Sequence, residues 1–289
     1  MNALTRSLPG AQRGDPQLLH QARVATRRLR EALPLVMSGS RGRKLERTVR
    51  RLTRALGPVR ELDVALEMLG ALTAGGDAPR GAIATLRRLV RQERHRLHAE
   101  MSRRVARVDF HKLRRRAVTA ASKGRGKAAA GRVRDPKRTV AAMLRAARRA
   151  VRLRNAIENA AGLYLPDRLH AVRIAVKRLR YAMEVSLELS GLGGSARIRT
   201  LREAQDLLGR MHDHEVLIAR VRALQGSPKA PNLRASADFD RIVRLLETEC
   251  RQIHGHYVTL RRKLLPVCDR AAAMPAAAAG APARRSSAA

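Results

Sequence analysis

Two stretches of the chain repeat one strongly basic pattern: HQARVATRRLR at residues 20–30 and HAVRIAVKRLR at 170–180. On a helix, where successive residues are about 100° apart, each copy brings one histidine and three cationic side chains onto one side. Arginine forms paired hydrogen bonds with phosphate oxygens, so this pattern favours the binding of a phosphate-rich anion. The side chains concerned are His20, Arg23, Arg27 and Arg30 in the first copy and His170, Arg173, Lys177 and Arg180 in the second.

Further basic residues recur at matching positions. Arg28 and Arg178 belong to the repeated pattern, and we count them with the candidate binding residues. A solvated helix face is the plainer interpretation, but such a face usually interleaves acids with its cations. Here acids are few, and Glu31 and Glu184 flank the two stretches. Second-tier candidates, which align with one another further along the two copies, are Arg47 and Arg50 with Arg199 and Arg202.

Signs of a metal site or an active site are weak. Neither repeated histidine has a second ligand three or four positions further on, and cationic neighbours disfavour a metal ion. We therefore expect no metal and no cofactor. The chain has no Walker-type glycine loop, no H-E-x-x-H and no G-x-S-x-G motif, which favours a non-catalytic protein. Acidic residues near 61–63 and 213–215 are expected to cap a helix or pair with arginines. The alternative is a metal-assisted phosphohydrolase that uses Asp63 and Asp213.

The charge of the chain points to a polyanionic partner. Its 289 residues include 61 Lys and Arg against 24 Asp and Glu, a formal net charge of +37. Self-repulsion at this level is relieved by nucleic acid, an anionic membrane or polyphosphate. Only 2% of the residues are aromatic, which counts against base stacking and against a helix lying on a membrane. No stretch is close to the length of about 20 apolar residues that a membrane span requires. No secretory signal is recognisable either, so we expect a cytoplasmic location.

Helical periodicity runs through most of the chain and predicts an all-α fold. The two basic stretches each lead to a Leu-Gly pair, at 56–57 and 208–209, and then to RELDV (60–64) and HDHEV (212–216). This self-similarity over about 150 residues indicates two pseudo-symmetric antiparallel helical bundles. The expected helices are 16–38, 43–56, 59–72 and 82–120 in the first half, and 137–162, 167–190, 196–208, 211–225 and 238–265 in the second.

The helical periodicity and the composition together divide the chain into five segments. Residues 1–14 are an N-terminal segment, which leaves the first bundle without a counterpart of helix 137–162. Residues 15–121 and 137–265 form the two bundle halves of one domain. The Gly-rich basic stretch 122–136 is the linker between them, and residues 266–289 read as a disordered Ala-rich tail.

The duplicated pattern H-x-x-R-[VI]-x-x-[KR]-R-L-R, with the Leu-Gly pairs that follow it, resembles the CHAD family, the conserved histidine α-helical domain. The resemblance covers about 15–265. It implies two four-helix bundles related by a pseudo-twofold axis, with basic residues of both halves lining a groove that binds inorganic polyphosphate without turnover. The E-x-E-x-K signature of the triphosphate-tunnel (CYTH) domain, to which family members are often fused, does not occur here, so a stand-alone CHAD domain is expected.

The resemblance implies that the ten residues of the repeated pattern contact polyphosphate, and that the protein works in the cytoplasm, including on polyphosphate granules. Non-specific nucleic-acid binding is the main alternative, because a basic surface also attracts the phosphates of a duplex. The sequence leaves open the oligomeric state and the preferred length of polyphosphate.

Overall fold

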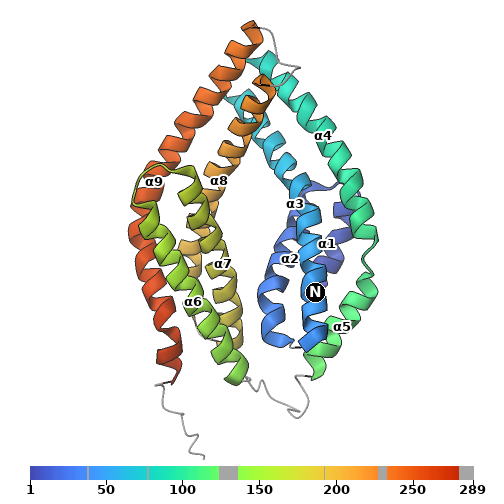
Figure 1. The fold of residues 1–289 in the computed structure, drawn as a ribbon, viewed down its shortest axis with the longest axis vertical. Coiled ribbons are helices and arrows are strands. Elements are labelled where there is room, and N and C mark those ends of the chain that lie inside the picture. The colour runs from blue at the N-terminus through green and yellow to red at the C-terminus, as the bar shows by residue number, and fades with distance from the viewer. Residues whose placement is uncertain (38, 77, 124–135, 192, 227–232, 280–289) are drawn as a thin grey trace, which may run out of the picture. The chain divides into compact units, whose positions relative to one another are not determined.

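The computed structural model describes the whole chain except residues 38, 77, 124–135, 192, 227–232 and 280–289. Every regular element among the described residues is an α-helix, which confirms the all-α prediction (Figure 1). None of these helices is both long enough and apolar enough to cross a membrane. The elements are α1 (Asn2–Gln12), α2 (Pro16–Val36), α3 (Gly39–Gly75), α4 (Arg80–Ala106), α5 (Phe110–Lys123), α6 (Pro136–Ala160), α7 (Pro166–Ser190), α8 (Ser195–Gln225) and α9 (Leu233–Ala279).

The helices pack as two compact units. The first unit contains Met1–Ala129 together with Gly209–His254, and the second contains Ala130–Leu208 together with Gly255–Ala289. Helices α8 and α9 therefore contribute one segment to each unit. This division differs from the expected one at the 122–136 linker, because residues 209–254 of the second half pack in the first unit.

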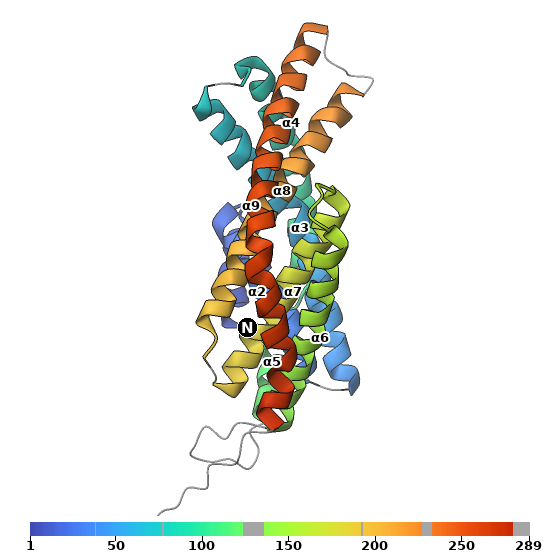
Figure 2. The ribbon, with the colours of Figure 1, turned by 90° about the vertical axis from the view of Figure 1, so that its left-hand side faces the viewer.

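The N-terminal residues form a helix, although the sequence led us to expect that the first bundle lacks a helix at this position. Helix α1 is short, but it lies beside α2 in the first unit (Figures 1 and 2). Leu4, Leu8 and Ala11 are buried on one of its sides and join a core with Leu19 and Leu56. Three buried side chains at a helical spacing are enough to hold α1 in place, although Pro9 lies inside it.

Both Leu-Gly pairs lie inside continuous helices, so the predicted breaks after residues 56 and 208 are wrong. Pro58 lacks an N–H group, and the carbonyl of Arg54 loses its usual partner four residues on. The helix continues because Leu56, Val59 and Leu62 are all fully buried around this point. Packing on both sides of the proline outweighs its local preference for a helix end.

The helix expected over 82–120 is in fact two helices. Helix α4 ends at Ala106 and α5 begins at Phe110. The side chain of Asp109 accepts a hydrogen bond from the backbone N–H of Lys112 at 2.7 Å, which satisfies one of the free donors at the start of α5. This capping residue, in the sequence VDF, was the available signal for the break.

The second unit is built around α6 and α7, which pack along much of their lengths. Alanines at 142, 146 and 150 of α6 are buried and allow α7 to approach closely. Helix α7 buries Leu169, Val172 and Leu179 and ends, as the glycine-rich sequence predicts, at Gly191, whose φ of 62° lies in the left-handed region. Of the expected linker, residues 124–135 lie outside the described part of the chain.

Helix α9 continues to Ala279, so the prediction of a disordered tail is wrong for residues 266–279. Val267, Cys268 and Ala271 are buried in the second unit, and this burial outweighs the proline at 266. Residues 280–289 of the predicted tail lie outside the described part of the chain.

Labelling of Cys268 tests this helical extension. Burial, with a smaller contribution from the nearby carboxylate of Asp269, raises the pKa of the Cys268 thiol to about 12. The thiolate is the reactive form, so in a Cys250→Ala variant we expect alkylation at neutral pH to be at least about a hundredfold slower in the native protein than in denaturant. Native labelling as fast as in the denatured chain would show that the residues after 265 are not packed.

Candidate anion-binding surface

The first basic stretch lies on α2 with one side in the core and one side open. Asp15 caps the start of the helix: its side chain accepts hydrogen bonds from the backbone N–H groups of Gln17 and Leu18 at 2.8 and 2.9 Å. Leu19 and Ala22 are fully buried. His20 is exposed, whereas Arg23 and Arg27 are half-buried. We refer to His20, Arg23 and Arg27 as the α2 stripe.

The members of the α2 stripe lie close enough together to influence one another. Although His20 is exposed as a whole, its ring is partly desolvated, and this lowers its pKa from the ordinary value first; the positive charges of Arg60, Arg27 and Arg23 lower it further. Arg60 comes from α3 and pairs with Glu67 at 2.9 Å. It was missed as a site residue. The signal that could have identified it is its place at the start of the RELDV sequence, three residues after Gly57 of the duplicated Leu-Gly pair.

Arg23 also has a structural role. Its Nη1 donates a hydrogen bond to the carbonyl oxygen of Gly57 at 2.6 Å and lies 4.0 Å from a carboxylate oxygen of Glu61. A Cβ atom at position 57 would lie 3.4 Å from the same nitrogen, an ordinary contact distance, so the bond itself does not require glycine there. The duplicated histidine motif and the duplicated Leu-Gly pair therefore meet in the first unit, and the bond joins α2 to α3.

The second basic stretch forms a similar row on α7. His170, Arg173 and Lys177 are half-buried, and we refer to them as the α7 stripe. The pKa of His170 is lowered by burial first, and then by the positive charges of Arg173 and Lys177. The same histidine position thus faces cations of its own helix in both units, as the helical spacing predicts.

Other members of the predicted site have different surroundings. Arg28 and Arg178 are exposed and Arg30 is half-buried. Arg180 is 6% exposed; its guanidinium donates to Glu184 at 2.5 Å and to Gln205 at 2.9 Å, and stacks 4.2 Å from the ring centre of Tyr181. The structure thus separates Arg180 from the exposed members of the motif. Its contact with polyphosphate stays a prediction.

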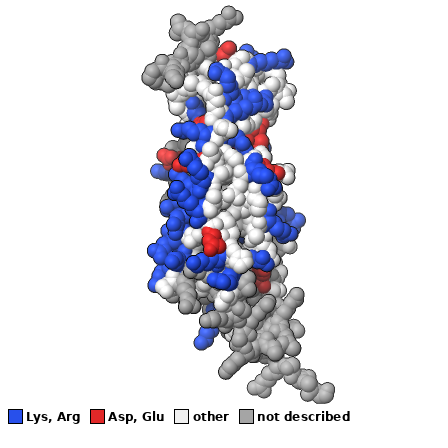
Figure 3. Space-filling model, turned by 90° about the vertical axis from the view of Figure 1, so that its right-hand side faces the viewer, with Lys and Arg blue, Asp and Glu red and all other residues white. Residues whose placement is uncertain are grey.

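The second-tier arginines all lie at the surface. Arg47 and Arg199 are exposed, Arg50 pairs with Glu46 at 3.1 Å, and Arg202 lies 3.5 Å from Glu184. Basic charge is also abundant away from the motifs. On the face drawn in Figure 3, Lys and Arg side chains greatly outnumber acids and flank a strip without charge. Any test of the two stripes must therefore be matched for total charge.

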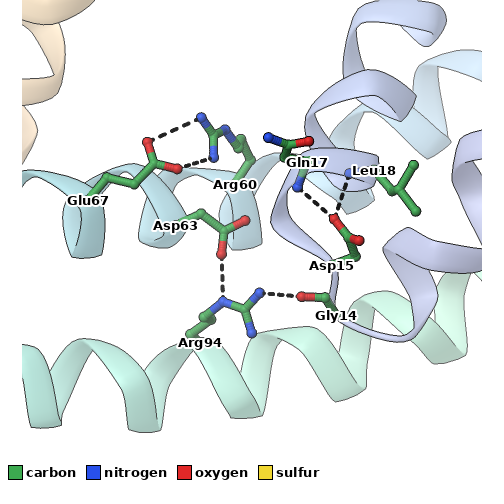
Figure 4. A network of polar contacts seen from close by, with 8 residues as sticks. All are labelled: Gly14, Asp15, Gln17, Leu18, Arg60, Asp63, Glu67 and Arg94. Carbon is green, nitrogen blue, oxygen red and sulfur yellow. Dashed lines mark hydrogen bonds and ion pairs between the residues drawn. The ribbon is translucent and has the colours of Figure 1, made fainter.

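The acidic residues of RELDV pair with arginines, as expected. Asp63 is buried, and its Oδ1 accepts a hydrogen bond from Nε of Arg94 in α4 at 2.6 Å (Figure 4). Arg94 also donates to the carbonyl oxygen of Gly14 at 2.8 Å, next to the capping residue Asp15. One guanidinium thus joins α3, α4 and the turn that begins α2. Asp63 is thus linked, through Arg94, to the turn that begins α2.

The corresponding HDHEV sequence lies in α8, where histidines take part in the contacts. Nδ1 of His214 lies 2.6 Å from the carbonyl oxygen of Arg210, and its Nε2 lies 2.7 Å from a carboxylate oxygen of Glu249 in α9. His212 lies 3.9 Å from Glu215. Among the described residues, no group of three or more His, Cys, Asp or Glu side chains is arranged to hold a metal ion.

Comparison with known proteins agrees with this arrangement of helices. The family model of the CHAD domain matches residues 1–222. The chain therefore belongs to the CHAD domain family, as the duplicated motif predicts. The crystal structure of the CHAD domain from the plant Ricinus communis superposes with a TM-score of 0.60 at 21% sequence identity, covering 91% of this chain and 89% of that one. No curated protein matches the sequence.

The lowered pKa values of His20 and His170 predict proton uptake on binding. Both histidines lose protons more readily in the folded protein than in the unfolded chain, so stability falls as the pH drops below about 6.5. A bound polyanion favours the imidazolium forms, so affinity for the anion rises over the same range. Calorimetry near pH 6.5 in buffers of different ionisation enthalpy should detect proton uptake on polyphosphate binding. Uptake that persists in a His20→Asn/His170→Asn variant would contradict this assignment.

Proposed function

We propose that this protein binds inorganic polyphosphate through the α2 and α7 stripes and does not catalyse a reaction on it. The observation that carries the proposal is the recurrence of one arrangement in two units: a histidine whose pKa is lowered by burial first and then by nearby cations, among them the arginine or lysine residues that follow it on the same helix. Membership of the CHAD family supports it, because this family is associated with polyphosphate.

The chemistry of polyphosphate suits such a row of cations. The polymer carries about one negative charge per phosphate and no bases, so charge and geometry are sufficient for recognition. Each phosphate that a cation neutralises releases counterions, which makes affinity fall steeply with salt. A chain with two Phe, three Tyr and no Trp offers few platforms for stacked bases. The proposed location is the cytoplasm, including the surface of polyphosphate granules.

A direct competition tests the proposal against non-specific nucleic-acid binding. Long-chain polyphosphate and duplex DNA are titrated at equal phosphate concentration and ~150 mM salt, where weak electrostatic binding is screened. We expect polyphosphate to bind at least about tenfold more tightly, because a flexible single chain can follow a helix stripe whereas a stiff duplex cannot. Equal affinities would support general attraction to phosphates, and tighter binding to DNA would overturn the proposal.

A further inference from the structure

A cavity of about 480 Å³ lies in the first unit, between α3, the α4–α5 turn and α5. Its size falls within the range of sites that hold small organic ligands. Five cationic side chains take part in its lining: Arg51, Arg54, Arg104, Arg107 and Lys112. Asp109 is the one acidic residue of the lining.

The charge of this lining is largely uncompensated. Arg104 pairs with Glu100 at 2.5 Å, and Asp109 is partly occupied by its hydrogen bond to the backbone of α5. Among the described residues, no acid forms an ion pair with Arg51, Arg54 or Arg107. These three side chains are exposed and contribute to the lining of the cavity, two from α3 and one from the α4–α5 turn. The rim therefore favours an anion, and arginine favours phosphate in particular.

The interior of the cavity is aliphatic. Its apolar lining consists of Leu45, Leu52, Ala55, Val108 and Leu113. All of these except Val108 are buried, so they form a floor beneath the exposed cations. The lining has no aromatic side chain to stack on a base. Apart from the cations, its polar residues are Thr48, which is uncharged, and Asp109, which is acidic. Such a floor fits a hydrocarbon group better than a nucleobase.

The cavity is distinct from the α2 stripe. Thr48, Leu52 and Ala55 recur at helical spacing and line it from one side of α3. At about 100° per residue, Gly57 falls on the opposite side from Thr48. Gly57 is the residue that Arg23 of the α2 stripe contacts. Occupation of the cavity thus leaves that contact intact.

From the cationic rim and aliphatic floor, we propose that this cavity binds a small organic phosphate with an aliphatic group. The phosphate lies between Arg51, Arg54 and Arg107, and the hydrocarbon group packs on Leu52 and Leu113. This is a second binding site, with a ligand class that differs from a polyphosphate chain by its apolar part.

A series of alkyl phosphates tests the two halves of the site separately. Inorganic phosphate, butyl phosphate, hexyl phosphate and octyl phosphate are titrated into the full chain by calorimetry, below their aggregation concentrations. We expect affinity to rise by roughly two- to fourfold for each added methylene and to level off when the cavity is full, because each buried methylene adds apolar contact. Affinity that does not change with chain length would overturn the proposal.

Two variants locate the binding. Arg51→Ala/Arg107→Ala should lower the affinity for hexyl phosphate at least about tenfold while the gain from butyl to hexyl phosphate persists. Ala55→Leu fills part of the floor and should abolish that gain while binding of the phosphate group persists. Because Ala55 is buried, this variant needs a check of folding by circular dichroism. The arginine pair is exposed, and its result decides the proposal independently.

The matched control is Arg88→Ala/Arg91→Ala, which removes the same charge from exposed positions of α4 outside the cavity. It should leave the affinity for hexyl phosphate within about twofold, because screening weakens charges beyond the site. Equal losses in the control and in the arginine pair would mean that hexyl phosphate senses only the general basic surface, and the cavity would not be its site.

Discussion

Changing Arg27, Arg28, Lys177 and Arg178 to alanine is expected to lower polyphosphate affinity at least about a hundredfold at ~150 mM salt. Arg27 and Lys177 belong to the α2 and α7 stripes, and Arg28 and Arg178 are their exposed neighbours. This choice leaves in place Arg23 with its bond to Gly57, and Arg180 with its bonds to Glu184 and Gln205. The dependence of log affinity on log salt should also become shallower by about 3, because up to four phosphate contacts are lost.

The control for this variant has the same net charge. Arg88, Arg91, Arg148 and Arg152 are exposed, two in each unit, and lie outside the motifs on α4 and α6. Their replacement by alanine should lower polyphosphate affinity less than about tenfold, as expected for loss of general attraction without loss of direct contacts. If both variants lose affinity equally, the stripes are ordinary basic surface, and the proposed function fails for this chain.

The two stripes can also be tested separately. Arg27→Ala/Arg28→Ala changes the first unit alone, and Lys177→Ala/Arg178→Ala changes the second alone. If one polyphosphate chain contacts both stripes, each double variant should weaken binding of the whole chain. If the stripes are independent sites, each double variant should instead halve the number of binding sites and leave the affinity of the other site unchanged. Calorimetry with short polyphosphate separates these results.

Local sequence patterns predict the position of the basic motifs on helices, but not how far each helix continues. The basic motifs could be placed on α2 and α7 because the amphipathic pattern and the caps at Asp15 and Gly191 agree. The continuation of α3 through Gly57-Pro58 and of α8 through Gly209 could not be predicted, because it depends on buried residues on both sides of these points. Local propensity contains no information about such tertiary packing.

The site shows the same limits. The cation rows around His20 and His170 follow from helical spacing, which the sequence contains. The contribution of Arg60 and the burial of Arg180 depend on which helices pack together, and sequence spacing alone does not specify that. The contact between Arg23 and Gly57 could be predicted only in part. Both residues stand in duplicated motifs, which the sequence shows, but only the structure shows that they form a hydrogen bond.

The second large effect is expected from Arg94→Ala, which should lower the stability of the protein by about 3–5 kcal/mol. Asp63 has a side chain only 3% exposed, and Arg94 is the cation that pairs with it. Removal of the guanidinium leaves a buried carboxylate without its compensating charge, and the carbonyl oxygen of Gly14 also loses a donor. In thermal unfolding followed by circular dichroism, the midpoint should fall by about 10 °C.

A second substitution identifies the cause of this loss. In Asp63→Asn/Arg94→Ala the uncompensated charge is absent, so the double variant should be more stable than Arg94→Ala alone by about 1 kcal/mol or more. The control Arg91→Ala removes an exposed cation from the same helix and should change stability by less than about 0.5 kcal/mol. If Arg94→Ala lowers stability no more than Arg91→Ala, the Asp63–Arg94 pair does not hold α3, α4 and the start of α2 together.

The polyphosphate affinity of Arg94→Ala, measured well below its unfolding midpoint, then reports on the position of α2. A loss there would mean that Asp63 and Arg94 hold His20, Arg23 and Arg27 in place for binding.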